Sequence, residues 1–212
     1  MNTPIVMRRA ISGSLILLAL AVLVGCGSDE SDESSNASPA AATRTYVATA
    51  PGTAAFVAVV VDGTRALAYV CDGVPADPVG TVPSVQAWFN GPSDGKTVNV
   101  TQPAGQLQLR LTETDVTGTM TLTGGREIPV AGRAVTGDAG LYRAEAEGGG
   151  NKAVAGWILA ADGQQRGGVG GEGTLPKLSG TRALSLAQPT FSLQNLATAR
   201  ISKVGITPIP IP

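Results

Sequence analysis

The chain has 212 residues, with 28 glycines, 14 prolines, few aromatic residues and a formal net charge of −1. It contains no histidine, which excludes Ser-His-Asp and Cys-His hydrolysis and zinc sites with histidine ligands. A nearly neutral chain also lacks the basic face that nucleic-acid binding requires, so we expect no nucleic-acid partner.

The first element is a short apolar segment that is typical of a secretory signal. Arg8 and Arg9 precede the apolar residues 10–25. This run is shorter than the roughly 20 residues that a transmembrane helix needs. We therefore predict a signal peptide over residues 1–25 rather than a retained membrane anchor.

This segment ends in Leu23, Val24, Gly25 and Cys26, and the ending resembles the lipobox of bacterial lipoproteins. The resemblance implies cleavage before Cys26 and diacylation of its thiol, which makes Cys26 the lipid-attachment residue. Acyl chains contribute about 0.8 kcal/mol per buried CH2, and two or more hold a protein stably at a membrane. The expected location is the extracytoplasmic face of the cell membrane, with the membrane as one partner.

Residues 26–51 have the composition of a disordered tether. Acidic residues and serines fill 28–35, Ala, Thr and Pro dominate the remainder, and Tyr46 is the single aromatic residue. Such a segment has too little apolar area to offset the entropy of ordering it. We interpret the acidic run as solvated rather than as a cation site, and we expect neither a metal nor a cofactor.

From residue 53 to 169 the sequence is typical of a series of short strands. Leu107, Leu109 and Leu111 alternate with polar residues, as in a strand with one buried face. Asp-Gly and Asn-Gly pairs separate such runs and supply the positive φ of tight hairpins. The predicted strands are 54–61, 65–71, 84–89, 97–101, 106–112, 115–123, 127–134, 141–147, 152–160 and 164–169.

Short gaps between these strands predict consecutive antiparallel pairing. The expected fold class is all-β, an antiparallel up-and-down barrel of about 8–10 strands, which would remove exposed sheet edges. A two-sheet β-sandwich is the alternative. The β-domain spans 52–180 in this prediction, and its glycine-rich stretch 164–180 is expected to form a mobile loop.

Three of the runs, 55–61, 66–71 and 153–159, are apolar on both faces, so a second layer must cover them. We predict that the C-terminal segment 181–212 provides this cover. Within it, Ser192 is a candidate cap for a short helix over 193–200, and an irregular proline-rich tail follows. Its apolar residues are Leu184, Leu186, Phe191, Leu193 and Leu196.

Several short motifs follow one another along the body: AYVCDG at 68–73, WFNG at 88–91, AGLYRAE at 139–145 and GWI at 156–158. In this order they resemble a domain of secreted and membrane-anchored proteins of actinobacteria. No activity is established for that domain. The resemblance therefore implies an actinobacterial source and an extracytoplasmic location. It assigns no functional residue.

Cysteine and aspartate are often catalytic in other proteins, but in this chain they have structural interpretations. Cys71 lies in line with Leu67 and Tyr69 on one strand face and is expected to lie in the core as a small hydrophobic residue. Asp62, Asp72, Asp94 and Asp162 precede glycines, where aspartate usually caps a turn. We predict no catalytic residue.

Four residues are candidates for ligand binding: Trp88, Arg143, Glu145 and Trp157. Arg143 and Glu145 share a strand face that the alternation predicts to be solvated, and a polar patch there could bind a ligand. The two tryptophans could stack on a sugar or line the mouth of a pocket. Cross-strand pairing and ordinary packing are the structural alternatives.

These observations favour a non-catalytic binding or recognition module of the cell envelope, with a protein, glycan or lipid as partner. A carboxylate-dependent glycan hydrolase is one alternative, and a structural envelope-assembly protein is another. An apolar cavity inside the body would favour carriage of a small ligand or lipid. A packed interior would favour recognition on the surface.

Overall fold

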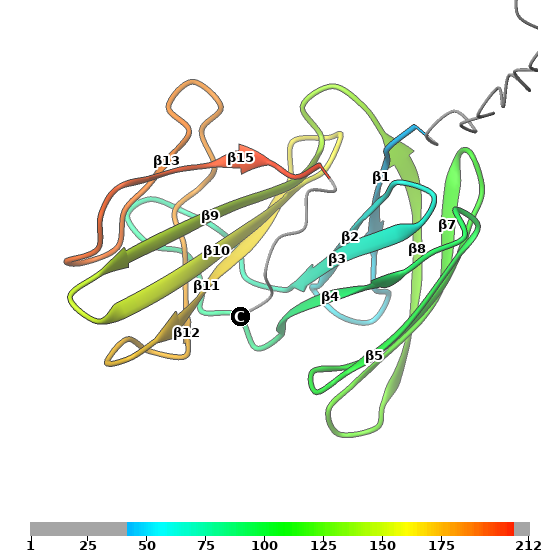
Figure 1. The fold of residues 1–212 in the computed structure, drawn as a ribbon, viewed down its shortest axis with the longest axis horizontal. Helices are drawn as coiled ribbons and strands as arrows, with labels where there is room; N and C mark the ends of the chain where they lie inside the picture. The colour runs from blue at the N-terminus through cyan, green and yellow to red at the C-terminus, as the bar shows by residue number, and fades with distance from the viewer. Residues whose placement is uncertain (1–41, 206–212) are drawn as a thin grey trace, which may run out of the picture. The chain divides into compact units, whose positions relative to one another are not determined.

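The computed structural model describes residues 42–205, and their regular structure consists of β-strands (Figure 1). The predicted signal peptide, Cys26, most of the predicted tether and the tail 206–212 lie outside the described residues. Residues 42–205 contain no helix long and apolar enough to cross a membrane.

The first eight strands form one antiparallel sheet, in the order β4-β3-β2-β1-β8-β7-β6-β5. Its two outer strands, β4 and β5, meet at a bridge between Ser93 and Val98, so the sheet is a nearly closed barrel. The predicted all-β antiparallel barrel is confirmed. The strands are β1 (Arg44–Thr49), β2 (Phe56–Val61), β3 (Arg65–Cys71), β4 (Gln86–Pro92), β5 (Thr97–Gln102), β6 (Gly105–Leu111), β7 (Asp115–Leu122) and β8 (Glu127–Val135).

Alternate residues of these strands point into the barrel and fill it. Leu107, Leu109 and Leu111 face inward as the sequence predicts, and they belong to one buried cluster with Phe89 and Met120. Inward and outward positions alternate along a barrel strand, so the polar residues between the leucines remain outside. The interior is therefore a packed core.

The strand β1 corrects the predicted tether, because residues 44–49 are ordered and central to the barrel. Tyr46 pairs with Val59 of β2 and with Ala134 of β8, and its side chain is fully buried. Its hydroxyl donates a hydrogen bond of 2.6 Å to the Thr112 carbonyl. Pairing on both sides supplies the contacts that this short segment lacks by itself.

The last three predicted strands do not belong to the barrel. They form a second antiparallel sheet in the order β12-β11-β10-β9-β15, and two short strands form a third. The predicted mobile loop over 164–180 is wrong, since most of it pairs as β11 and β12. These strands are β9 (Gly140–Gly148), β10 (Asn151–Leu159), β11 (Gln165–Glu172), β12 (Leu178–Ser179), β13 (Thr190–Phe191), β14 (Ala199–Arg200) and β15 (Ser202–Lys203).

The second sheet packs against the outside of the barrel. This interlayer core combines Tyr69 and Trp88 of the barrel with Leu141, Val154 and Ile158 of the sheet. The doubly apolar strands β2 and β3 are therefore covered by β9 and β10. The C-terminal segment contributes Val204 to this core. The prediction that this segment is the main cover of β2 and β3 is wrong, because the second sheet occupies that face.

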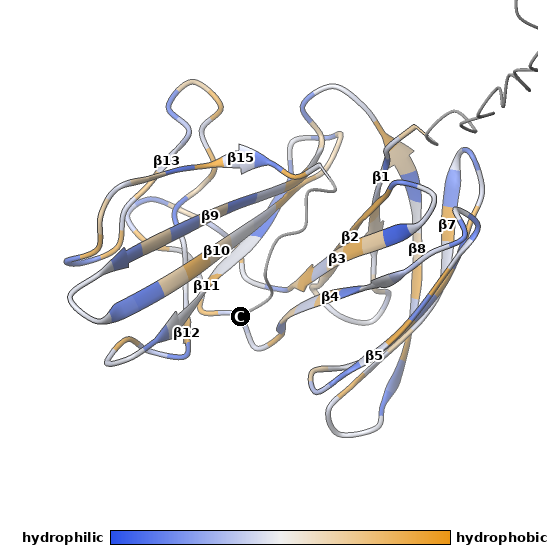
Figure 2. Cartoon of the chain, viewed as in Figure 1, coloured by the Kyte–Doolittle hydropathy of each residue, from blue (hydrophilic) through white to orange (hydrophobic). Residues whose placement is uncertain are grey.

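The C-terminal segment covers the opposite face of the second sheet, as predicted for β10. Trp157 and Val169 pack there against Leu184, Phe191 and Leu196. Bands of hydrophilic and hydrophobic residues alternate along β9, which lies between these two covers (Figure 2).

The predicted helix over 193–200 does not form. Gln194 has a φ of 47°, which belongs to a turn rather than to a right-handed helix. Arg200 then pairs with Thr190 in the sheet of β13 and β14. The backbone at the end of the predicted helix therefore forms strand hydrogen bonds instead of helical ones.

Candidate recognition site

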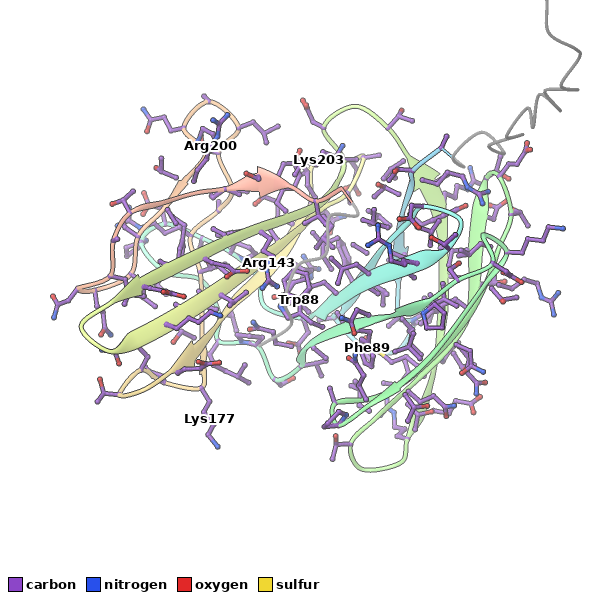
Figure 3. All side chains as sticks on the ribbon, viewed as in Figure 1. Trp88, Phe89, Arg143, Lys177, Arg200 and Lys203 are labelled. Atoms are coloured by element: carbon purple, nitrogen blue, oxygen red, sulfur yellow. The ribbon has the colours of Figure 1, made fainter. Side chains whose placement is uncertain are left out.

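Three of the four predicted binding residues lie together where β9 faces the barrel. Trp88 comes from β4, whereas Arg143 and Glu145 come from β9. The Arg143 guanidinium carbon is 4.7 Å from the centroid of the Trp88 ring, and Figure 3 shows the two residues side by side. On the barrel, the Trp88 ring also stacks on Tyr69, with 4.3 Å between ring centroids. The cation therefore lies against a pair of aromatic rings.

Ion pairs hold Arg143 in this position. Its Nη2 and Nε donate hydrogen bonds of 2.6 and 3.0 Å to the same carboxylate oxygen of Glu145. Lys152 of β10 places its Nζ 3.9 Å from the other oxygen of Glu145. Only 4% of the Arg143 side chain is exposed, against 34% for Glu145. The buried cation is thus linked to the surface through a half-exposed carboxylate.

The close approach of the two layers depends on a glycine. Gly156 of β10 pairs with Arg143 of β9. A Cβ at Gly156 would lie 2.7 Å from Cζ of Tyr69 and 2.8 Å from Cζ2 of Trp88. Both distances are shorter than carbon atoms tolerate, so the aromatic pair can reach the sheet only where the side chain is absent.

Arg143 does not lie on a solvated face, and that part of the prediction is wrong. The alternation along β9 correctly separates Arg143 and Glu145 from Tyr142 and Ala144. The face that carries the charged residues, however, turns toward the barrel, and Arg143 is 5% exposed. A contact with a strand distant in sequence buries a position that alternation assigns to solvent.

A surface hollow of about 270 Å³ opens beside this cluster, and its lining adds residues that the sequence analysis missed. Arg200, Ser202 and Lys203 come from the C-terminal segment and face the edge of β9. The Lys203 Nζ donates a hydrogen bond to the Gly137 carbonyl. No local pattern in the sequence indicates that this segment returns to β9. The lining comprises Arg143, Ala144, Glu145, Arg200, Ser202, Lys203, Val204 and Gly205.

Trp157 does not join the other three candidates. It lies on the opposite face of the second sheet, edge-on to Phe191 with 5.8 Å between ring centroids. Its indole nitrogen donates a hydrogen bond of 2.9 Å to the Arg182 carbonyl. Trp157 borders a separate hollow of about 150 Å³ and acts mainly as core of the outer layer.

Cys71 is fully buried in the interlayer core, as predicted. Desolvation raises the pKa of its thiol above the usual value, which keeps the thiol protonated at neutral pH. The Gly73 N–H donates to its sulfur at 3.4 Å. A protonated, inaccessible thiol fits a structural role.

The four aspartates before glycines all bond to nearby backbone or side chains. Asp62, Asp94 and Asp162 accept backbone N–H bonds within their own turns, as predicted. Asp72 differs, because it accepts bonds from Ser84 and from the Val85 N–H and so closes the long connection between β3 and β4. Within residues 42–205, no group of three or more Cys, Asp or Glu residues is close enough to hold a metal ion.

Comparisons with known proteins add no assignment. A scan against protein-family models, a search of curated proteins and a search of solved structures each found no significant match.

Proposed function

We propose that the chain is a lipid-anchored lipoprotein of the cell envelope whose β-body recognises an acidic glycan on its outer surface without catalysis. Residues 23–26 support the anchor through their resemblance to a lipobox. The packing of the body and the chemistry of the hollow beside β9 support the recognition function.

The filled barrel is the observation that carries this proposal. Tyr46, Phe89, Leu107 and Met120 are among the largest side chains with less than 2% of their surface exposed. They belong to one contiguous cluster inside the barrel. Carriers built on eight strands keep an interior cavity for their ligand, whereas side chains fill this one. A partner would therefore contact the outside of the body.

The hollow beside β9 offers the groups that an acidic glycan requires. Arg200 and Lys203 supply positive charge, Ser202 supplies a hydroxyl, and Glu145 accepts hydrogen bonds. Arg143 lies at the base of this arrangement, where Trp88 and Glu145 fix it. Cations bind carboxylate or phosphate groups, and neutral sugar hydroxyls pair with Ser and Glu side chains.

The ionisation of the turn acids favours recognition over the alternative of glycan hydrolysis. A hydrolase needs a carboxylic acid whose pKa is raised toward neutrality. Backbone hydrogen bonds instead lower the pKa of Asp94 and of Asp162. At Asp62, desolvation is outweighed by hydrogen bonds from Arg65 and Thr64, which bring the pKa to about 2. These three carboxylates hold their turns as anions.

The anchor is tested by labelling growing cells with a radioactive fatty acid. Cys26→Ser should abolish the label and leave an unprocessed precursor. Cys71→Ser is the matched control, because its thiol is buried in the core and should leave labelling intact. Label that persists in the Cys26→Ser protein would contradict the anchor.

The recognition function is tested by co-sedimentation of the full chain, in detergent, with purified cell-wall sacculi. Arg200→Glu should reduce the bound fraction at least fivefold, since it reverses a charge at the hollow. Lys177→Glu makes the same charge change outside the hollow and should have no effect (Figure 3). Equal losses in both variants would contradict the site. Release of soluble fragments from the sacculi, abolished by one Asp or Glu substitution, would favour the hydrolase.

A further inference from the structure

The hollow beside Trp157 is separate from the candidate recognition site. It measures about 150 Å³ and lies on the face of the second sheet that the C-terminal segment covers. The two hollows share no lining residue within the described part of the chain. An inference from this hollow is therefore independent of the proposed glycan recognition.

The inner wall of this hollow is apolar and partly aromatic. Trp157 and Val169 are 2% and 1% exposed, and Phe191 and Ile201 are each 6% exposed. The Trp157 indole N–H already donates to the Arg182 carbonyl, so it needs no acceptor from a ligand. An apolar cavity of roughly this volume is large enough to bind a benzene molecule. The inner part of the hollow therefore fits one apolar ring.

Two segments that are hydrogen-bonded to each other form the mouth. The Gly80 N–H donates to the Thr181 carbonyl at 2.9 Å, and Nε of Arg182 donates to the Pro78 carbonyl at 3.0 Å. A Cβ at Gly180 would overlap the Gly80 carbonyl, so the two backbones meet where a side chain is absent. The mouth is thus held in place by backbone contacts.

Exposed apolar side chains are concentrated on the same two segments. Within residues 42–205, the large apolar residues that are exposed are Val74, Val79, Val82, Leu178 and Leu186. Val79 is 61% exposed and also lines the hollow. Scattered exposed apolar residues are ordinary, whereas a concentration of them marks an interaction site. The mouth therefore combines apolar surface with an apolar interior.

The charge at the mouth is positive. Arg182 is the single charged residue among the described residues that line this hollow. Its Nε lies 3.6 Å from the Asp77 carboxylate, and the two side chains are 71% and 81% exposed, so this ion pair is weak. Both contacts of the guanidinium within the body use Nε, which leaves the Nη groups able to donate to an anion. A carboxylate is the complementary group.

We propose that this hollow binds a small aromatic carboxylate, with its ring against Trp157 and Phe191 and its carboxylate paired with the Arg182 guanidinium. The volume limits the buried part of the ligand to a single ring, and edge-to-face contacts with aromatic residues stabilise such a ring. The carboxylate remains at the mouth, where it keeps much of its hydration. The body then has a second binding site in addition to the glycan site beside β9.

Benzoate, added to the ¹⁵N-labelled full chain in detergent, is the probe that tests this site. Each of the two indole N–H groups gives one NMR signal, and the signal lost in Trp88→Phe assigns both. Benzoate should shift the Trp157 signal saturably and leave the Trp88 signal unchanged, because the two rings lie in different cores. Acetate has the charge without the ring and should shift neither signal.

The charge contact is tested by a matched pair of arginine variants. Arg182→Gln removes the guanidinium and keeps the backbone carbonyl that Trp157 uses, and it should weaken benzoate binding at least about fivefold. Arg200→Gln removes the same charge from a residue that lines only the other hollow, and it should leave benzoate binding unchanged.

The mouth is tested by two exposed valines of one loop. Val79→Asp places a repelling carboxylate at the mouth and should also weaken benzoate binding. Val82 is 58% exposed and does not line the hollow. Val82→Asp should therefore bind benzoate as the unchanged chain does, in about 0.15 M salt, which screens distant charges.

Three results would overturn the proposal. The first is the absence of a saturable shift of the Trp157 signal with benzoate, and the second is a shift that acetate reproduces. The third is an equal loss of binding in Arg182→Gln and Arg200→Gln, since the acid would then occupy the hollow beside β9. Arg200→Glu with sacculi tests the glycan site separately, so either site can fail without the other.

Discussion

The barrel and the second sheet bury their apolar residues in different ways. The barrel curls until its outer strands meet, so its own residues fill its interior. The second sheet stays open and needs a layer on each face, the barrel on one and the C-terminal segment on the other. A closed sheet is thus largely self-sufficient, whereas an open sheet depends on contacts with residues distant in sequence.

The composition of the two regions reflects this difference. Valine is the commonest residue of the barrel core, which also contains alanine, leucine and methionine. The second sheet has four glycines in β11 and two alanines in each of β9 and β10, where layers approach closely from both sides. The two buried polar or charged residues of the described chain, Arg143 and Thr181, also belong to the layered part. Polar groups are therefore held where layers meet, which is also where the candidate site lies.

The largest expected effect comes from removing part of the outer cover. Phe191→Ala should lower the free energy of unfolding by about 3–5 kcal/mol, because it opens a cavity beside Trp157. Leu186→Ala is the control, since Leu186 is 41% exposed and should cost less than about 1 kcal/mol. Urea denaturation measures both. Equal, small changes would show that the second sheet does not depend on its cover.

The charged contact between the layers should have the next largest effect. Arg143→Met removes hydrogen bonds to a carboxylate and should cost about 1.5–3 kcal/mol. Arg133→Met breaks the pair with Asp115 on the barrel surface, where the side chains are 86% and 51% exposed, and should cost less than about 1 kcal/mol. Added salt should weaken only the second pair. A smaller loss of unfolding free energy in Arg143→Met than in Arg133→Met would contradict the conclusion that the buried pair of Arg143 and Glu145 is the stronger one.

The spacing of the layers is probed by two glycines on the same face of the second sheet. Gly156→Ala should cost about 1–3 kcal/mol, since its Cβ would overlap the rings of Tyr69 and Trp88. At Gly170 the nearest atom to a new Cβ is 3.6 Å away, an ordinary contact, so Gly170→Ala should be neutral or slightly stabilising. Thermal unfolding of both variants decides whether the layers can separate. Equal midpoints would mean that they can.

The same contrast explains how far the sequence predicts the fold. Hairpin-linked strands such as β6 and β7 were predictable because alternation and turn residues are local signals. The strand β1 was missed, since it pairs with β8, some 90 positions along the chain, and its residues resemble the tether before it. For Tyr46 in particular, a lone aromatic residue among Ala and Thr carries no local signal of burial.

The candidate site was predictable only in part, for the same reason. Trp88, Arg143 and Glu145 were selected as residue types suited to binding, but nothing local places β9 against β4. Arg200 and Lys203 were missed because the C-terminal segment returns to β9 from far along the chain. Trp157 was grouped with Trp88, although strand periodicity in β10 does not reveal which layer covers which face.

The smallest expected effects come from two buried tyrosines of the barrel strands, of which Tyr46 faces the barrel interior and Tyr69 the interlayer core. Tyr46→Phe removes the hydrogen bond to the Thr112 carbonyl in the barrel and should cost about 0.5–1.5 kcal/mol. The Tyr69 hydroxyl, near Cys71 and the Gly168 backbone, has no partner with hydrogen-bond geometry among the described residues. Tyr69→Phe should therefore be neutral or stabilising at pH 7, because it removes a buried polar group that gains nothing from folding.

Alkaline pH should separate the same two variants further. Desolvation raises the pKa of Tyr69 well above its ordinary value near 10. Above pH 10 the unfolded chain loses this proton while the folded chain keeps it, so stability present below pH 10 is lost as the pH rises. Tyr69→Phe should flatten that loss, which urea midpoints at pH 8 and pH 11 measure. Tyr46→Phe should flatten it less, since its pKa is raised by a weaker desolvation that the Arg44 charge partly offsets. If the urea midpoint of Tyr69→Phe falls between pH 8 and pH 11 as much as that of the unchanged chain, water reaches the interlayer core. The two layers would then be packed less tightly against each other than the residues inside the barrel.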